Sequence, residues 1–248
     1  MSVVVSPNQS QIQTVLRTVL LDFLPAGVDV IEGQDNRVPE PQEVDFVVMT
    51  ALQRTRLATN IDSYVDAAYT GSVSGGVLTV SDLLLGTVLT GAALFGTNVA
   101  TNSVIGTQIS GTTGGVGTYN VTPSQTVTSE VMASGAASAM QETEITFQLD
   151  VHGPNSADNA QMISTLFRDD YATSRFYELN PAISPLYADD PRQAPFLNDQ
   201  DQIETRWIVQ AKLQANQTVA NIPQQFGDVF NVELISVDVV YPPEPVLT

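Results

Sequence analysis

Residues 145–156 of this 248-residue chain, ITFQLDVHGPNS, decide its fold class. The first seven residues alternate between apolar and polar side chains, which is the period-2 pattern of a strand with one buried face. Gly153–Ser156 then predicts a turn and a helix cap. Apolar residues at helical spacing follow: Ala160, Ile163, Leu166, Phe167 and Tyr171. A strand therefore leads directly into a helix.

The N-terminal segment predicts another core helix. Ser6 stands before Pro7, and Gln9 lies three residues after Ser6, so Ser6 is the predicted cap and Pro7 the first helical residue. Pro25 and Gly27 should end the helix. Its buried stripe is Ile12, Val15, Leu16, Val19, Leu20 and Phe23.

Strands account for most of the remaining globular sequence. We expect strands at 28–31, 46–56, 203–213 and 232–241, followed by a proline-rich tail. The 46–56 strand should be buried on both faces at its start and exposed at Arg54 and Arg56. The fold class is therefore α+β, with a mainly antiparallel sheet packed with two helices.

Composition changes abruptly near residue 70. Residues 70–138 hold 12 of the 16 glycines, no Lys or Arg, and only Asp82 and Glu130 as acids. Short β candidates at 77–80, 104–109, 117–121 and 126–132 predict a small all-β domain, because this β-branched content is too high for a flexible linker. Residues 1–69 and 139–248 would then form one discontinuous α+β domain around the 70–138 insertion.

The net charge of −18 excludes direct nucleic-acid binding, which needs clustered cations. Two interpretations remain open. The acidity either serves solubility alone or, in a channel, repels a passing DNA duplex.

The sequence offers few residues that could carry catalysis. The chain has no Cys and one His, and we interpret His152 as a surface histidine at a strand end. The pairs Asp169–Asp170 and Asp189–Asp190 are more typical of solvated carboxylates than of an acid/base pair. We expect no enzyme activity, no metal and no cofactor. We also find no secretory signal and no apolar run of membrane-spanning length, so we expect no membrane partner and a product that stays in the cytosol where it is made.

Residues 180–202 are rich in Pro and Asp and predict a long loop. Such loops often serve as contact arms, with Phe196 and Leu197 as possible anchors. A loop folded over its own domain is the alternative.

Several strings, in this order, resemble the neck or tail-terminator (tail completion) proteins of contractile-tailed bacteriophages. They are residues 34–41, QLDVHG at 148–153, PLY at 185–187, RW at 206–207 and PQQF at 223–226. The resemblance covers about 5–68 and 139–248. The 70–138 segment resembles β modules added to virion proteins and is a departure from shorter family members.

The resemblance implies a homo-oligomeric ring, a hexamer, at the head–tail junction of the virion. Its partners would be tail tube and sheath proteins and head–tail connector or collar proteins, with DNA passing through unbound. Candidate interface residues are Pro185, Leu186, Tyr187, Phe196, Leu197, Arg54 and Arg56. A receptor- or carbohydrate-binding adhesin, with Phe95 and Tyr119 as the aromatics of its recognition module, is one alternative, and a cell-wall hydrolase is another.

Overall fold

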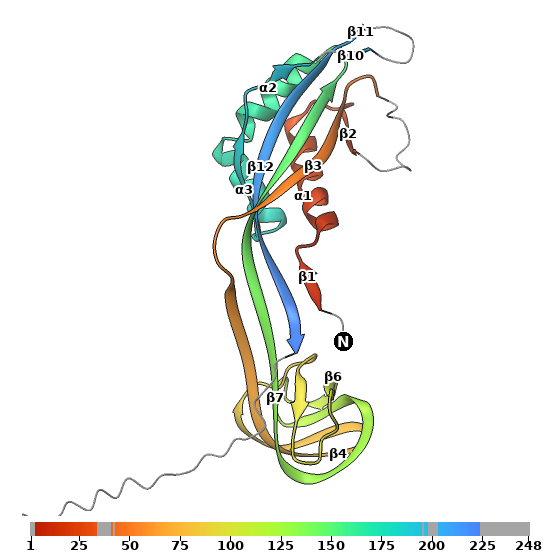
Figure 1. Ribbon diagram of the computed structural model, residues 1–248. Helices are drawn as coiled ribbons and strands as arrows, with labels where there is room; N and C mark the ends of the chain where they lie inside the picture. Colours follow the sequence, from red (N-terminus) through yellow and green to blue (C-terminus); the bar gives the residue numbers. More distant parts are fainter. Residues whose placement is uncertain (1–2, 34–40, 42, 195, 198–202, 224–248) are drawn as a thin grey trace, which may run out of the picture.

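The structure is a computed structural model that describes residues 3–33, 41, 43–194, 196–197 and 203–223. The molecule is elongated, with an upper and a lower lobe joined by a narrow ribbon of strands (Figure 1). The predicted strand at 232–241, the proline-rich tail and most of the 34–41 run lie outside the described residues.

One sheet runs through the whole molecule, and its central member is the 36-residue strand β7 (Gly117–His152). In the upper lobe β7 lies between β3 (Phe46–Arg56) and β12 (Arg206–Pro223), antiparallel to both. Short strands extend the sheet outward: β2 (Asp29–Glu32) beside β3, and β1 (Val4–Ser6), β8 (Ile183–Ala188) and β9 (Arg192–Gln193) beside β12. Among the described strands only β2 pairs in parallel, so the predicted mainly antiparallel α+β fold is confirmed in its main features.

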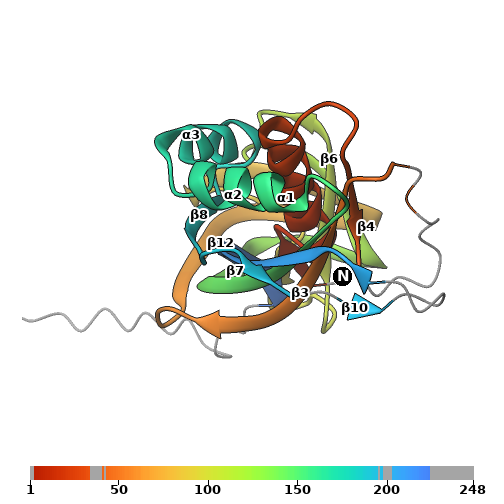
Figure 2. The ribbon, with the colours of Figure 1, turned by 90° about the horizontal axis from the view of Figure 1, so that it is seen from above.

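Three helices cover one face of the upper sheet: α1 (Gln9–Phe23), α2 (Ser156–Leu166) and α3 (Asp170–Leu179) (Figure 2). The upper core lies between them and the sheet. Ile145, Phe147, Leu149 and Val151 contribute to it and are fully buried, which confirms the period-2 prediction.

The prediction of two helices was wrong because the second stretch divides. The chain turns at Phe167–Asp169, and the Asp169 side chain accepts a hydrogen bond from the Tyr171 backbone N–H at 2.9 Å, which starts α3. Tyr171, predicted to be in the buried stripe, is 48% exposed.

The α1 cap was also assigned to the wrong residue. Ser6 ends β1, and Asn8 caps the helix: its side chain accepts from Gln11 N at 2.9 Å, while Gln11 accepts from Asn8 N at 2.8 Å. The capping box is present, shifted by two residues.

The start of β3 also differs from expectation. Val47 and Met49 are fully buried, but Phe46 and Val48 on the other face are only half-buried, because no helix covers that face. From Ala51 onward β3 is exposed, as predicted for Arg54 and Arg56.

The lower lobe consists of β4 (Ile61–Gly86), β5 (Ala93–Phe95), β6 (Val104–Gly111) and the first part of β7. These strands curl around a second core that includes Tyr69, Leu78, Ile105 and Met132 and shares no residue with the upper core. The expected short strands at 77–80, 117–121 and 126–132 are parts of β4 and β7, which run unbroken through residues 70 and 138.

Candidate subunit interface

A ribbon of strands without a core joins the two lobes; it consists of β4, β7 and β12, with β1 along the outer side of β12. Met140 at its centre pairs with Ile61 of β4 on one side and Thr218 of β12 on the other. Residues 136–140 are only half-buried, and neither core includes Met140, Ile61 or Thr218. Both faces of the sheet are therefore open here.

Strands β3 and β4 form one continuous edge along β7. Arg56 pairs with Thr143, Leu57 N donates to Glu142 O at 3.0 Å, and Ile61 pairs with Met140. Large apolar side chains are exposed all along this edge: Leu52 (49%), Leu57 (45%), Ile61 (51%), Tyr64 (60%) and Val65 (38%). We call residues 50–65 the β3–β4 edge.

Both predicted interface arginines lie on the β3–β4 edge. Arg54 donates to Gln217 Oε1 at 2.7 Å and also to Gln9 Oε1, while Arg56 donates to Asn60 Oδ1 at 2.9 Å. All three acceptors are neutral amide oxygens. Four other basic residues, Arg168, Arg175, Arg206 and Lys212, form ion pairs with carboxylates of the same chain.

The other predicted interface residues with described side chains lie at the opposite edge of the sheet. Pro185, Leu186 and Tyr187 belong to β8, which pairs with β12 from Ala211 to Ala215. Leu186 is 43% and Tyr187 44% exposed. The strand order β8–β12–β7–β3 separates these residues from Arg54 and Arg56 by two strands.

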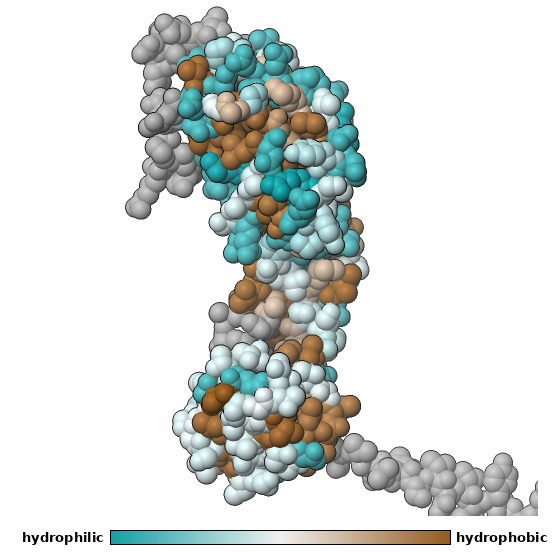
Figure 3. Space-filling model, turned by 180° about the vertical axis from the view of Figure 1, so that it is seen from behind, coloured by the Kyte–Doolittle hydropathy of each residue, from teal (hydrophilic) through white to brown (hydrophobic). Residues whose placement is uncertain are grey.

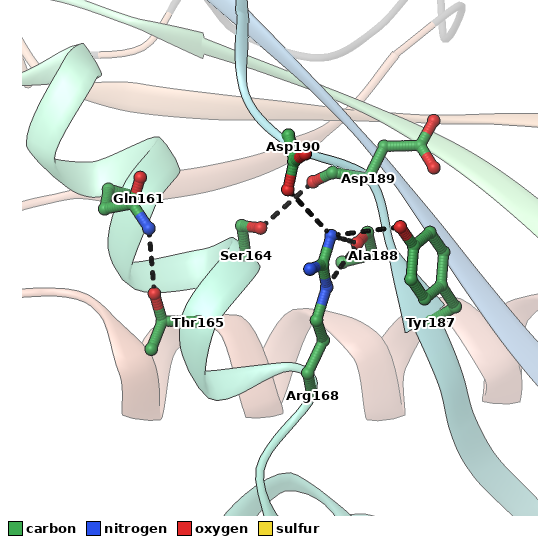
Figure 4. Close-up of polar contacts among 8 residues, drawn as sticks. All are labelled: Gln161, Ser164, Thr165, Arg168, Tyr187, Ala188, Asp189 and Asp190. Atoms are coloured by element: carbon green, nitrogen blue, oxygen red, sulfur yellow. Dashed lines mark hydrogen bonds and ion pairs between the residues drawn. The ribbon is translucent and has the colours of Figure 1, made fainter.

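Arg168 fixes the end of β8 to helix α2 (Figure 4). Its Nε donates to Ala188 O at 2.6 Å, its Cζ lies 4.5 Å from the centre of the Tyr187 ring, and Nη2 lies 3.1 Å from Asp190 Oδ1. Ser164 adds a bond to Asp189 O at 3.0 Å. Because the Asp190 carboxylate is 89% exposed, the ion pair contributes little, and the bonds to backbone oxygens hold the segment.

The expected long loop at 180–202 is therefore largely structured. Residues 183–188 and 192–193 are strands on the chain's own β12, and Phe196 and Leu197 form β10 (Phe196–Leu197), paired with β11 (Ile203–Glu204). The described part folds over its own domain, which was the alternative to a free arm. The side chains of Phe196 and Leu197 lie outside what the structure describes.

His152 is not the surface residue that the sequence predicted. It is 8% exposed, and its ring stacks on Phe46 with centroids 4.5 Å apart. Burial lowers the pKa of His152, which Arg206 lowers further and Asp150 and Glu204 partly raise. Its cross-strand neighbours, Phe46 on β3 and Arg206 on β12, flank it on both sides.

Tyr119, one of the two aromatics on which the adhesin alternative depends, is also buried. It is 1% exposed, and its hydroxyl donates to Gly115 O at 2.6 Å. Phe95 is half-buried. In the described part of the chain, no helix has the length and apolar character to cross a membrane.

Two different sheet edges that are open within the described residues, with exposed apolar side chains along them, are typical of a protein that assembles with others. The particular assembly follows from sequence comparison. The chain belongs to the phage neck terminator protein family, whose model matches residues 80–241, well over half of the chain. This is a family of structural proteins of the virion neck, not of enzymes. The comparison with curated proteins gives no match.

The family match confirms the neck-terminator resemblance but covers different residues from those expected. It takes in residues 80–138, most of the glycine-rich segment that we interpreted as a departure from the family. It starts after 5–68, where part of our resemblance lay.

The sequence reasoning missed Gln217 and Arg168, which hold the two edges in place. Gln217 is 8% exposed and donates to Pro7 O at 2.7 Å, while it accepts from Arg54. A polar residue inside a strand pattern carries no signal of such a partner 210 positions away in the chain. Arg168 could have been found from its position, because it is a basic residue at the end of the predicted second helix.

Proposed function

We propose that copies of this chain form a closed ring, a homohexamer, at the head–tail junction of a contractile-tailed phage. The ring terminates the tail tube and joins it to the head connector. Family membership supports the place in the virion neck. One structural observation carries the ring: the sheet ends in two different open edges.

The two edges favour a head-to-tail contact. One is β8, with Leu186 and Tyr187 exposed, and the other is the β3–β4 edge with its apolar row. A contact between two different surfaces of identical chains propagates, and it closes into a ring when the rotation per copy divides a full turn. Two identical edges would instead favour a two-fold dimer.

The charge distribution supports a channel lined by the upper lobe. Only Asp82 and Glu130 of the 27 acidic residues lie within residues 70–138, which leaves 27 − 2 = 25 for the rest of the chain. Figure 3 shows the same division, with hydrophilic residues prevailing in the upper lobe and residues of intermediate hydropathy in the lower one. An acidic wall repels duplex DNA and lets it pass without being held.

We further propose that residues 70–138 act as a module inserted into a terminator domain of residues 1–69 and 139–248. A second hydrophobic core, made mostly of residues 70–138 together with Ala67 and Tyr69, supports this division. The nearly uncharged lower lobe would then project from the ring or contact tube, sheath or collar proteins.

Native mass spectrometry and negative-stain imaging of the full-length protein test the ring. We expect one dominant species of six copies and an annulus with a central opening. A chain that stays monomeric at the highest soluble concentration would contradict the proposal. In phage particles made without this protein, we expect heads and tails that do not join.

A further inference from the structure

We propose that the β3–β4 edge of one copy is completed by a strand from the C-terminal segment of its neighbour, residues 232–241. This inference deepens the proposed ring and rests on it. It assigns an occupant to the longest open edge of the described fold.

The edge offers an unpaired row of backbone groups. β7 pairs with one side of β3 and β4, while on the outer side β2 reaches only Met49, through its pairing with Glu32. At the lower end Thr87 N donates to Asp66 O at 3.2 Å. Between Met49 and Asp66, no strand within the described residues lies on the outer side. Such an edge is a template for another strand.

The side chains of the edge fit an apolar and acidic strand. Its exposed row runs from Leu52 through Ile61 to Val65. Arg54 and Arg56 add positive charge to the edge. Their hydrogen bonds go to neutral amide oxygens, so no carboxylate compensates this charge in those contacts. Residues 50–65 hold two Arg and one Asp, a net charge of +1 in a chain of net charge −18.

The C-terminal segment has the complementary sequence. Residues 232–241, VELISVDVVY, place Ile235, Val237, Val239 and Tyr241 at alternate positions, which predicts a strand with an apolar face. The acids of residues 224–248 are Asp228, Glu233, Asp238 and Glu244, and this stretch has no basic residue. Ten residues of strand span about 33 Å, which is shorter than the edge.

The position of Pro223 favours a neighbour over the same chain. Pro223 ends β12 opposite Ala136, on the other side of β7 from β4. To reach its own β3–β4 edge, the segment would have to cross a face of the ribbon, about 10 Å wide at two strand spacings. A neighbour that presents its β3–β4 edge to the β12 side receives the segment directly. This arrangement is head-to-tail, as the ring requires.

Disulfide trapping tests the inference cleanly, because the chain has no cysteine. One full-length chain carries Ser63→Cys on β4, and a second, longer by a tag, carries a single cysteine at 234, 236 or 238. The two are co-expressed and oxidised. Side chains opposite each other on paired strands lie about 5 Å apart at Cβ, close enough to cross-link.

We expect a disulfide-linked heterodimer with at least one donor position, at a yield about tenfold above the control, because paired strands hold the cysteines at high effective concentration. The matched control is Ser184→Cys, an exposed serine on β8 at the opposite edge. Native mass spectrometry of the same samples reports the ring separately.

The outcomes separate the two proposals. Hexamers whose cross-links do not exceed the control overturn the strand exchange and leave the ring intact. Monomers overturn both. Hexamers with an enriched heterodimer support both.

Discussion

The two lobes share the strand β7 but bury it by different means. In the upper lobe, three helices cover one face of the sheet, and β7 alternates between fully buried residues such as Phe147 and half-buried polar residues such as Gln148. In the lower lobe, which has no helix among its described residues, the sheet folds back over its own face. The hydrophobic effect requires a cover for an apolar face but does not specify which kind.

Glycine makes the second solution possible. At Gly86, φ is +76° and an added Cβ would lie 1.9 Å from Asp66 O, so only glycine lets β4 return against its own beginning. Gly111, with φ +99°, has a similar approach to Val116 O at 2.2 Å. The high glycine content of residues 70–138 therefore reflects tight curling, not flexibility.

The largest expected effects on stability come from substitutions that test whether the lobes unfold separately. Phe147→Ala removes a fully buried ring from the upper core and should cost about 3–5 kcal/mol, and Leu78→Ala should cost about 2–5 kcal/mol in the lower core. Because the two cores share no residue, we expect each substitution to lower one calorimetric transition and leave the other in place.

The exposed Leu85→Ala serves as the matched control for Leu78→Ala, since Leu85 is 71% exposed and its loss should change little. A single transition that both core substitutions lower by the same amount would show that the shared strands make the lobes one cooperative unit.

A smaller effect is expected where helix α1 meets the ribbon. Gln217→Ala removes the donor to Pro7 O and the acceptor for Arg54, both in a buried or half-buried setting, and should cost about 1–3 kcal/mol. Only the upper transition should respond. Gln214→Ala is the control, because Gln214 is half-buried and, among the described residues, its side chain donates to Asn216 on the same strand. Equal losses from the two substitutions would refute this role for Gln217.

The helix cap gives a finer test within the upper lobe. Asn8→Ala should destabilise that lobe by about 1 kcal/mol, because the Gln11 N–H loses its acceptor. Ser6→Ala should have almost no effect, although the sequence pattern predicts Ser6 as the cap. Chemical denaturation of both variants distinguishes the two assignments, and a larger loss from Ser6→Ala would reverse ours.

Some elements of the upper lobe could be predicted from the sequence, and others could not. Local patterns predicted α1 and the strands β3 and β7 of the upper lobe. Each of these elements buries one face in the upper core, so its apolar residues recur at a regular spacing. The break between α2 and α3 was not predicted, since Phe167 and Tyr171 continue the helical spacing while the Asp169 cap interrupts the backbone. At this point the side-chain cap, and not the spacing of the apolar residues, determines where the helix breaks.

Long-range pairing was the other part beyond prediction. Nothing local shows that Pro185–Tyr187 and Arg54–Arg56 lie at opposite edges of one sheet, because strand order depends on pairings between residues far apart in the chain. The ribbon was missed for the same reason. Its small central residues Ala136 and Ala137 appear as part of the glycine-rich segment until their pairing with β4 and β12 is known.

The smallest expected difference between the lobes is their response to mild acid. Burial lowers the pKa of His152, so the unfolded chain binds a proton more readily than the folded one. The stability that this gives is fully present above the unfolded pKa of about 6.5 and is lost as the pH falls below it. The upper transition should therefore move down between pH 7.5 and 5.5. The lower lobe has no His, so its transition should move less than the upper one.

His152→Gln isolates this contribution, because carboxylates such as Asp150 are common to both proteins and cancel in the comparison. We expect a shallower pH dependence of the upper transition in the variant, measured by calorimetry in buffers of matched ionic strength. The sign is fixed by burial, which is the main cause of the lowered pKa of His152; Arg206 acts in the same direction, while Asp150 and Glu204 oppose it. An unchanged slope would mean that His152 binds its proton equally well in the folded and the unfolded chain. The pH response would then come from the acidic surface of the upper lobe, which the lower lobe does not have to the same extent.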